Sequence, residues 1–170
     1  MREIHLVLGG ARSGKSAYSE QLALGSKDTL HYIATAQAFD DEMQTRIQRH
    51  QADRSARFHT LEEPIELSRR ISELSVPGHT IVVDCLTLWM SNLLMCEPEN
   101  MATRSQTLID ALKSSKGRVI LVSNEISMGV IPLGESNRRF VDELGRLHQG
   151  IAREAQHVTL MVAGIPSVIK

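Results

Sequence analysis

The segment that most restricts the fold of this chain is a glycine-rich octapeptide near its start, GGARSGKS at residues 9–16. It fits the pattern GxxxxGK[ST], and it lies between an apolar run at residues 4–8 and a stretch of helical period at residues 15–24. Glycines let successive backbone N–H groups turn toward phosphate oxygens, and the helix that follows directs its positive dipole end at them. The octapeptide therefore predicts a phosphate-binding loop between a strand and a helix.

The motif also assigns roles to its polar side chains. Lys15 is expected to reach the β- and γ-phosphates of a nucleoside triphosphate, and Ser16 is expected to ligate Mg²⁺. A metal in such a loop needs an acidic partner at the carboxyl end of a neighbouring strand, and Asp84 ends the apolar run TIVVD. Asp84 equally suits the N-cap of a helix that begins near Leu86. Arg12 suits a phosphate contact or a solvated surface position.

The rest of the chain alternates short apolar runs with longer segments of helical period. This alternation predicts an α/β fold with a mostly parallel sheet flanked by helices, and the nearly continuous apolarity of the strands indicates burial on both faces. Pro64 suits the first position of a helix. The expected strands are 4–8, 30–35, 80–84, 118–123 and 158–162, the expected helices are 15–24, 40–54, 64–74, 86–95, 103–114 and 136–155, and residues 96–102 and 127–135 are expected to be loops.

Length and charge narrow the class of protein further. The 170 residues are expected to form one domain, 1–170, and the balance of 19 basic against 20 acidic residues argues against a nucleic-acid binder. No apolar stretch is long enough for a membrane span. Cys85 and Cys96 lie in apolar sequence without metal-ligand spacing, which is typical of buried thiols in the cytoplasm.

The expected helix 40–54 contains one candidate catalytic histidine, His50. Met43, Ile47 and His50 share a helical face, and Arg46 lies one turn before His50. A neutral imidazole is a competent nucleophile near neutral pH. Taken alone, however, the pattern favours an ordinary surface histidine.

Several motifs along the whole chain resemble one family, the bifunctional adenosylcobinamide kinases and adenosylcobinamide-phosphate guanylyltransferases of cobalamin biosynthesis. The RIxxH helix and the NExxxGxxP segment are more specific to this family than the glycine-rich loop is. The resembling segments are GGARSGKS at 9–16, YIATAQAFDDEMQTRIQRH at 32–50, TLE at 60–62, VVDCLT at 82–87, VSNEISMGVIP at 122–132 and VAGIPSVIK at 162–170.

The resemblance implies a transferase with a RecA-like fold of the P-loop NTPase type that catalyses two reactions. The first phosphorylates the aminopropanol hydroxyl of adenosylcobinamide with ATP or GTP. The second moves GMP from GTP onto a histidine and then onto adenosylcobinamide phosphate, giving adenosylcobinamide-GDP. The resemblance also implies a homotrimer and the use of Mg²⁺ in the kinase step, whereas the cytoplasmic location is expected from the two cysteines.

The family motifs transfer residue by residue. They imply that His50 is the guanylylated nucleophile, that Lys15 is catalytic and that Ser16 and Asp84 hold the metal. Glu62 is a candidate for binding the guanine N1–H and exocyclic amine or the ribose, although an acid in the first turn of a helix is the other interpretation. The implied nucleotide contacts are Gly9, Gly10, Ala11, Arg12, Ser13, Gly14, Lys15, Ser16, Ala34, Thr35, Ala36, Gln51, Ala52, Asp53, Arg54, Glu62 and Asp84.

Two other functions stay open on the sequence: a P-loop kinase for another small molecule without the guanylyl step, and a nucleotide-dependent switch that is not an enzyme. Some residues are also open. Trp89, Met90 and Met95 suit a contact with a corrin or a neighbouring subunit or, at this helical spacing, more readily the core. Asn124 and Glu125 suit a position near the γ-phosphate or a plain loop. The family often has asparagine where His148 stands, and on a long helix this position indicates packing rather than catalysis.

Overall fold

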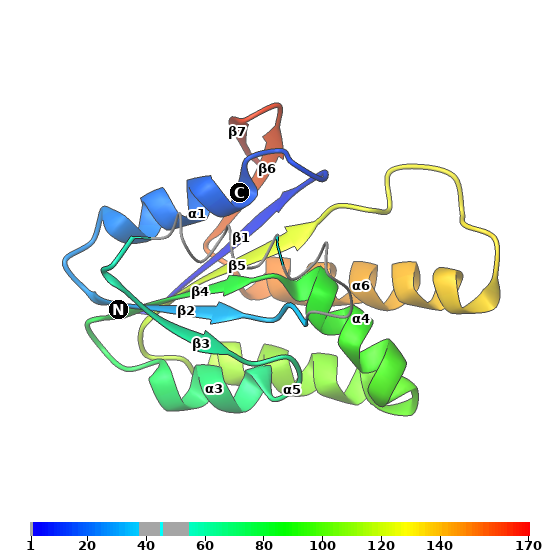
Figure 1. Ribbon diagram of the computed structural model, residues 1–170, viewed down its shortest axis with the longest axis horizontal. Coiled ribbons are helices and arrows are strands. Elements are labelled where there is room, and N and C mark those ends of the chain that lie inside the picture. The colour runs from blue at the N-terminus through cyan, green and yellow to red at the C-terminus, as the bar shows by residue number, and fades with distance from the viewer. Residues whose placement is uncertain (1, 38–44, 46–54) are drawn as a thin grey trace.

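Seven strands form a single sheet in the order β3-β2-β4-β5-β1-β6-β7 (Figure 1). The structure, a computed structural model, describes residues 2–37, 45 and 55–170, so the expected helix 40–54 lies outside the described residues except for Thr45. All neighbouring strands pair in parallel except β6 and β7, which are antiparallel. The strands are β1 (Glu3–Gly9), β2 (Thr29–Ala34), β3 (Phe58–Glu62), β4 (His79–Asp84), β5 (Arg118–Asn124), β6 (His157–Val162) and β7 (Ile165–Val168).

Helices cover both faces of the sheet. Helix α1 lies on one face, where its apolar side packs with Val7, Tyr32 and Met161 from three strands. The other helices lie on the opposite face over a larger apolar core that includes Ile81 and Leu121. The helices are α1 (Lys15–Leu24), α3 (Leu67–Leu74), α4 (Leu86–Cys96), α5 (Met101–Lys113) and α6 (Glu135–Glu154), with a 3₁₀ turn η1 (Pro98–Asn100).

The predicted fold class is confirmed, because the sheet is mostly parallel and buried between two helical layers. Each of the five predicted strands is present. Two further strands, β3 and β7, were not predicted, because they are short and lie at the two edges of the sheet, where exposed positions interrupt the apolar run. Within the described residues, no helix combines the length and apolarity needed to cross a membrane.

Three local predictions are wrong. The helix predicted at 64–74 begins only at Leu67, because the Glu63 carboxylate accepts bonds from the N–H groups of Ile65 and Glu66 and so forms a turn around Pro64. The loop predicted at 96–102 is mostly helical, since η1 joins α4 directly to α5. Cys96 is exposed, whereas Cys85 is buried as predicted.

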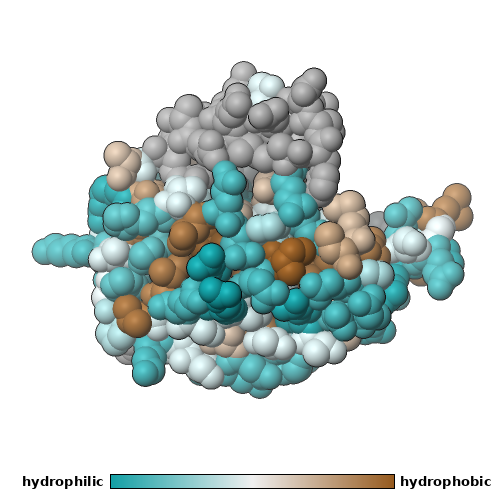
Figure 2. Space-filling view, turned by 60° about the horizontal axis from the view of Figure 1, so that its bottom comes forward, coloured by the Kyte–Doolittle hydropathy of each residue, from teal (hydrophilic) through white to brown (hydrophobic). Residues whose placement is uncertain are grey.

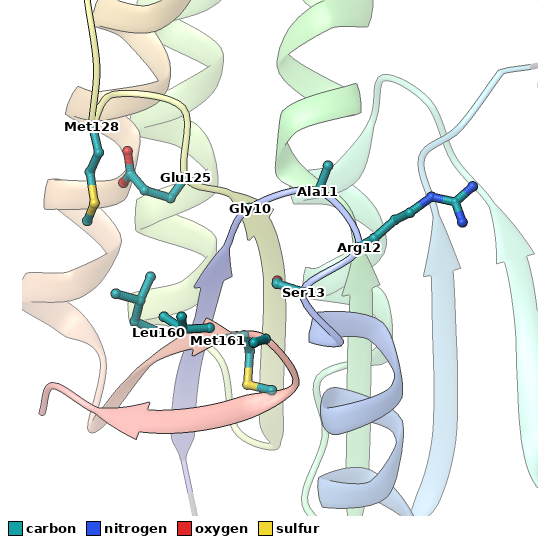
Figure 3. A pocket seen from close by; sticks show the side chains of 10 residues that line it. Gly10, Ala11, Arg12, Ser13, Glu125, Met128, Leu160 and Met161 are labelled. Carbon is teal, nitrogen blue, oxygen red and sulfur yellow. The ribbon is translucent and has the colours of Figure 1, made fainter.

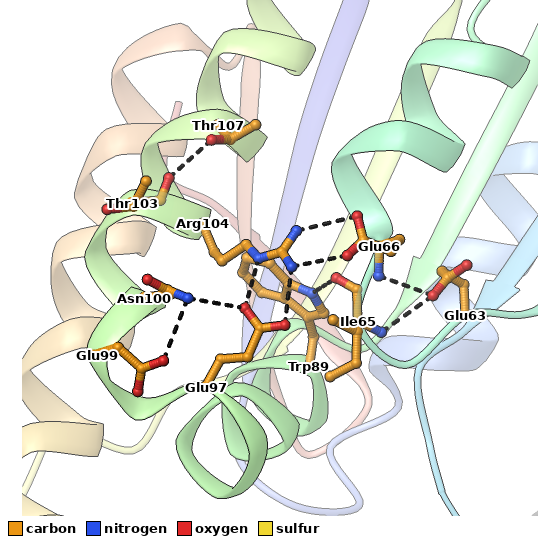
Figure 4. A network of polar contacts seen from close by, with 10 residues as sticks. All are labelled: Glu63, Ile65, Glu66, Trp89, Glu97, Glu99, Asn100, Thr103, Arg104 and Thr107. Carbon is orange, nitrogen blue, oxygen red and sulfur yellow. Dashed lines mark hydrogen bonds and ion pairs between the residues drawn. The ribbon is translucent and has the colours of Figure 1, made fainter.

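A polar network ties the start of α3 to α4 and α5 (Figure 4). The Arg104 guanidinium lies 2.8 Å from Glu66 and 2.9 Å from Glu97. Beneath it the Trp89 indole N–H donates to the carbonyl of Ile65 at 2.9 Å. Trp89 and Met90 are fully buried, which confirms the core interpretation for both, while Met95 is 56% exposed. The network fixes the turn that follows β3.

One segment carries apolar side chains into solvent. It is the loop from β5 to α6, which projects at the right of Figure 1, and Figure 2 shows hydrophobic colour at the same projecting end. Val130 is 96% exposed and Leu133 is 90% exposed. The helical face that comes forward in Figure 2 is mostly hydrophilic by comparison.

Asn92 on α4 joins two strand ends from beneath. Its buried side-chain amide donates to the carbonyl of Thr35 at 2.9 Å, just after β2, and to the carbonyl of Pro64 at 3.1 Å, just after β3. Buried carbonyls need such donors because they are shielded from water. Asn92 therefore holds the carboxyl ends of β2 and β3 in a fixed relation to α4.

Replacing Asn92 by leucine keeps the volume but leaves both carbonyls without this donor. We expect Asn92→Leu to lower the free energy of unfolding by about 1–3 kcal/mol. Urea denaturation followed by circular dichroism measures the change. The control is Ser91→Ala on the same helix, which we expect to stay within about 0.5 kcal/mol of the original chain. Equal stability of Asn92→Leu and the original chain would contradict this role.

Candidate functional site

The octapeptide 9–16, called the P-loop from here on, turns at the carboxyl end of β1 and leads into α1. Gly14 has φ 92°, a conformation that favours glycine, and it stands directly before the first helical residue, Lys15. The Lys15 side chain is 7% exposed, and its ammonium donates to the carbonyl of Gly10 at 2.6 Å. The ammonium thus points back over the loop, where it faces the space enclosed by the backbone.

The two predicted metal-side residues lie together. The Ser16 hydroxyl donates to Asp84 Oδ2 at 2.6 Å, although β5 separates the strand that carries Asp84 from β1. The Tyr32 hydroxyl donates to the same oxygen at 2.6 Å. One carboxylate, one hydroxyl and the oxygens of a bound phosphate form a donor set that suits Mg²⁺, which prefers few protein ligands and keeps waters.

The carboxyl end of β2 is anchored to this carboxylate strand. The Thr35 N–H donates to the carbonyl of Asp84 at 3.1 Å, and the Thr35 hydroxyl bonds both the carbonyl and the N–H of Cys85. In the sheet Ala34 is the register partner of Asp84 on one side and of Glu62 on the other. The predicted residues on β2, β3 and β4 therefore meet at one edge of the sheet.

Some of the predicted nucleotide contacts lie within the described residues, and the others lie outside them. The P-loop residues, Ala34, Thr35 and Asp84 lie at the carboxyl edge of the sheet, Glu62 is an exposed residue at the end of β3, and Ala36 is half-buried just after β2. The nucleophile predicted at His50 and the neighbouring contacts Gln51, Ala52, Asp53 and Arg54 lie outside the described residues.

The P-loop is seated on the β6–β7 hairpin. The N–H of Gly164 in the hairpin turn donates to the carbonyl of Ser13 at 3.0 Å. A Cβ added to Gly9 would lie 2.6 Å from the carbonyl oxygen of Met161 on β6, so only glycine fits at this position. The hairpin thus fixes the first half of the loop on the side away from Asp84.

A buried polar chain supports the loop that follows β5. The His148 ring bonds Ser123 at 2.7 Å, Ser123 lies 3.1 Å from the Thr87 hydroxyl, and the N–H of Asn124 donates to Thr87 at 2.7 Å. Burial lowers the pKa of His148 to about 4 against a small opposing effect of Glu125. His148 is therefore a neutral packing residue, in agreement with the prediction for its position.

Glu125 follows Asn124 and stands beside the P-loop. Its N–H donates to the carbonyl of Gly9 at 3.0 Å, and its carboxylate accepts bonds from the Ser127 hydroxyl and backbone. Burial opposes ionisation, but these hydrogen bonds outweigh it and lower the pKa of Glu125. The carboxylate is consequently charged at neutral pH.

Sequence reasoning missed Tyr32 and the end of β6. Tyr32 stands two residues before Ala34 on β2, and only the adjacency of β2 and β4 brings its hydroxyl to Asp84. Residues 160–162 belong to the expected strand 158–162, yet nothing in the sequence indicates that this strand ends beside the P-loop. The signal for both is the order of strands, which the motifs do not contain.

Comparison with known proteins agrees with the geometry. The family model described as cobinamide kinase / cobinamide phosphate guanyltransferase matches residues 5–169. The bifunctional adenosylcobalamin biosynthesis protein CobP of Pseudomonas aeruginosa is 50% identical over 166 residues, which cover 97% of this chain and 96% of that protein. The bifunctional adenosylcobalamin biosynthesis protein CobU of Salmonella typhimurium is 38% identical, with 97% of this chain and 98% of that protein covered.

Solved structures share the fold at low sequence identity. One of them, described as an ATPase domain, is 13% identical with a TM-score of 0.52, over 94% of this chain and 69% of that chain. The flagellar accessory protein FlaH from Methanocaldococcus jannaschii has a TM-score of 0.52 at 13% identity, over 99% of this chain and 78% of that chain. These likenesses agree with the predicted α/β fold with a mostly parallel sheet, and they concern the fold alone.

Two substitutions test whether Asp84 binds the metal or only accepts hydrogen bonds from Ser16 and Tyr32. We expect Asp84→Asn to reduce Mg²⁺-dependent nucleotide turnover by roughly a hundredfold or more, because the charge that holds the metal is lost. Tyr32→Phe removes only a hydrogen bond to the same oxygen, and we expect its turnover to stay within about tenfold of the original. Steady-state formation of nucleoside diphosphate at saturating nucleotide and acceptor measures both. Similar losses in the two variants would contradict a metal role for Asp84.

The lowered pKa of His148 makes stability depend on pH. The unfolded ring takes up a proton below its ordinary pKa of about 6.5, whereas the folded ring stays neutral down to about 4, so the folded state loses stability as the pH falls between these values. We expect His148 to contribute up to about 2 kcal/mol to the loss of stability between pH 7 and pH 5, so that the loss is smaller by this amount in His148→Asn. His5, whose pKa burial also lowers to about 4, adds the same trend in both chains. Urea unfolding at both pH values tests this, and the same pH slope in the variant would contradict it.

Proposed function

This chain belongs to the cobinamide kinase / cobinamide phosphate guanyltransferase family, and from that membership we propose the reactions that it catalyses and the residues that carry them. It phosphorylates adenosylcobinamide with ATP or GTP, and it then transfers GMP from GTP to adenosylcobinamide phosphate. The observation that carries the assignment is the full-length relation to two proteins named as bifunctional. This relation favours both activities over a kinase without the second step and over a switch.

The kinase step uses the P-loop and the Ser16–Asp84 pair. The hydroxyl oxygen of the aminopropanol arm bonds to the γ-phosphorus, the bond to the bridging oxygen breaks, and the nucleoside diphosphate leaves while the hydroxyl proton passes to solvent. Backbone N–H groups of the loop and the Lys15 ammonium stabilise the charge on the phosphoryl oxygens. Ser16 and Asp84 would hold Mg²⁺, which would supply further charge neutralisation for the phosphoryl transfer.

The guanylyl step uses the neighbouring strand ends. A ring nitrogen of His50 bonds to the α-phosphorus of GTP, and pyrophosphate leaves. An oxygen of adenosylcobinamide phosphate then bonds to the same phosphorus, and the P–N bond to His50 breaks. The proposed GTP contacts Thr35 and Glu62 stand where β2 and β3 end, and along the chain His50 belongs to the segment that joins these two strands.

We also propose that one domain, residues 1–170, carries both reactions, because a single sheet bears the described residues of both steps. The family resemblance supports a homotrimer and a cytoplasmic location. Exposed apolar side chains on the loop after β5 and on β7, among them Val130, Leu133 and Val168, supply surface that contact between subunits would cover.

The covalent step is tested by labelling with [α-³²P]GTP. We expect the original chain to take up a label that is stable to base and labile to acid, as a phosphoramidate is, and we expect His50→Ala to take up none. His50→Ala should still phosphorylate cobinamide from [γ-³²P]ATP, while Lys15→Ala should lose both reactions. The matched control is His59→Ala, an exposed histidine on β3, which should keep the label. An unlabelled original chain, or a label that survives in His50→Ala, would contradict the assignment.

A further inference from the structure

A pocket of about 420 Å³ lies beside the P-loop, on the side of β6 (Figure 3). We call it the β6 pocket. Apart from the P-loop, no residue proposed above for the guanylyl step lines it. Its lining residues are Gly10, Ala11, Arg12, Ser13, Glu125, Met128, Leu160, Met161, Val162 and Ala163.

The chemistry of the lining favours an uncharged, largely apolar group with hydrogen-bond donors. Met128, Leu160 and Met161 direct apolar side chains at the space, and the P-loop adds its backbone (Figure 3). Glu125 contributes a carboxylate that is charged at neutral pH, which repels phosphate but accepts bonds from hydroxyl or amine groups. A purine base with its ribose has these properties, and its size suits a pocket of this volume.

The position of the pocket relative to the metal side gives the direction of the nucleotide. Ser16 and Asp84 lie toward β4, whereas the pocket lies on the other side of β1. In a P-loop the metal and the lysine hold the β- and γ-phosphates. A triphosphate whose γ-phosphate faces Asp84 therefore directs its α-phosphate and nucleoside toward β6, into this pocket.

The guanylyl step requires the opposite direction. Its proposed contacts, Thr35 and Glu62, stand at the ends of β2 and β3, beyond β4. With the departing pyrophosphate in the P-loop, a nucleoside held by Thr35 and Glu62 lies on the side of β2 and β3. One bound nucleotide cannot satisfy both requirements.

We propose that the β6 pocket is the nucleoside subsite of the phosphoryl donor, and that the chain binds nucleotides in two opposed directions about one P-loop. This inference rests on the proposed pair of reactions. The seating of the loop supports it: Gly164 bonds Ser13, and Gly9 packs against Met161, so one wall of the pocket is held in place without ligand.

The two binding directions also determine which side of the P-loop each reaction uses. The acceptor hydroxyl attacks the γ-phosphorus from the side opposite the bridging oxygen, which is the side of β4 and β2. Guanosine occupies that same side in the second reaction, so acceptor arm and guanosine use it in turn. The apolar lining of the β6 pocket gives little basis for distinguishing adenine from guanine, so the first reaction accepts either.

Filling the pocket tests the subsite. We expect Leu160→Trp to raise the KM for ATP in the phosphorylation of cobinamide at least about tenfold, while single-turnover labelling of the protein by [α-³²P]GTP stays within about twofold. Val162→Trp, at a position that is 58% exposed, is a second filling variant that is easier to accommodate. The matched control is Ile165→Trp, which adds the same bulk to the same hairpin outside the pocket and should leave both reactions unchanged.

The outcomes distinguish failure of the proposed subsite from failure of the proposed function. Failure of the original chain to phosphorylate cobinamide or to take up label counts against the proposed function. Parallel loss of both reactions in the filling variants, or no change in either, overturns the subsite. Photolabelling with 8-azido-ATP checks the direction in the original chain: adducts are expected within 160–163 or on Met128, and adducts confined to residues 34–62 would overturn the proposal.

Discussion

The hydrogen bond between Ser16 and Asp84 is the contact on which the organisation of the site depends. It joins the first turn of α1 to the end of β4 across the intervening strand β5, and the Tyr32 hydroxyl completes it from β2. In the order of the sheet, all six strands from β3 to β6 run parallel, so their carboxyl ends lie at one edge. Helix α1 packs over β1, β4 and β5, which brings its first turn to that edge. The phosphate loop and the carboxylate thus become one site.

Buried polar contacts beneath the carboxyl edge of the sheet hold the strand ends in position. On one side Asn92 holds the ends of β2 and β3, and on the other side His148, Ser123 and Thr87 hold the start of the loop after β5. These groups are shielded from water, so each lost partner has a high cost and the arrangement tolerates little displacement. The side chains that would meet substrate range from the buried Lys15 and Thr35 to the exposed Glu62, and they depend on this buried layer for their positions.

A single phosphate loop with surfaces on both sides accounts for two transfers in a short chain of near-zero net charge. Anion binding needs only local donors, namely the backbone of the P-loop and Lys15, so the overall balance of 19 basic and 20 acidic residues is no obstacle. The loop is held from the β6 side by the hairpin and from the β4 side by Ser16 and Asp84. A rigid loop between two different surfaces can receive a triphosphate from either direction.

The sequence by itself determined those features that depend only on residues close together in the chain. The octapeptide specifies the P-loop, because glycine conformations and the lysine–serine pair belong to neighbouring residues, and the apolar runs specify five strands and most of the helices. Family motifs indicated the reactions and the residues of the site. The tertiary structure decided what depends on strand order: that Tyr32 reaches Asp84, that Trp89 and Met90 are core, that β3 and β7 close the sheet, and that β6 ends beside the P-loop. Strand order follows from the packing of the whole chain, and no short segment of sequence contains it.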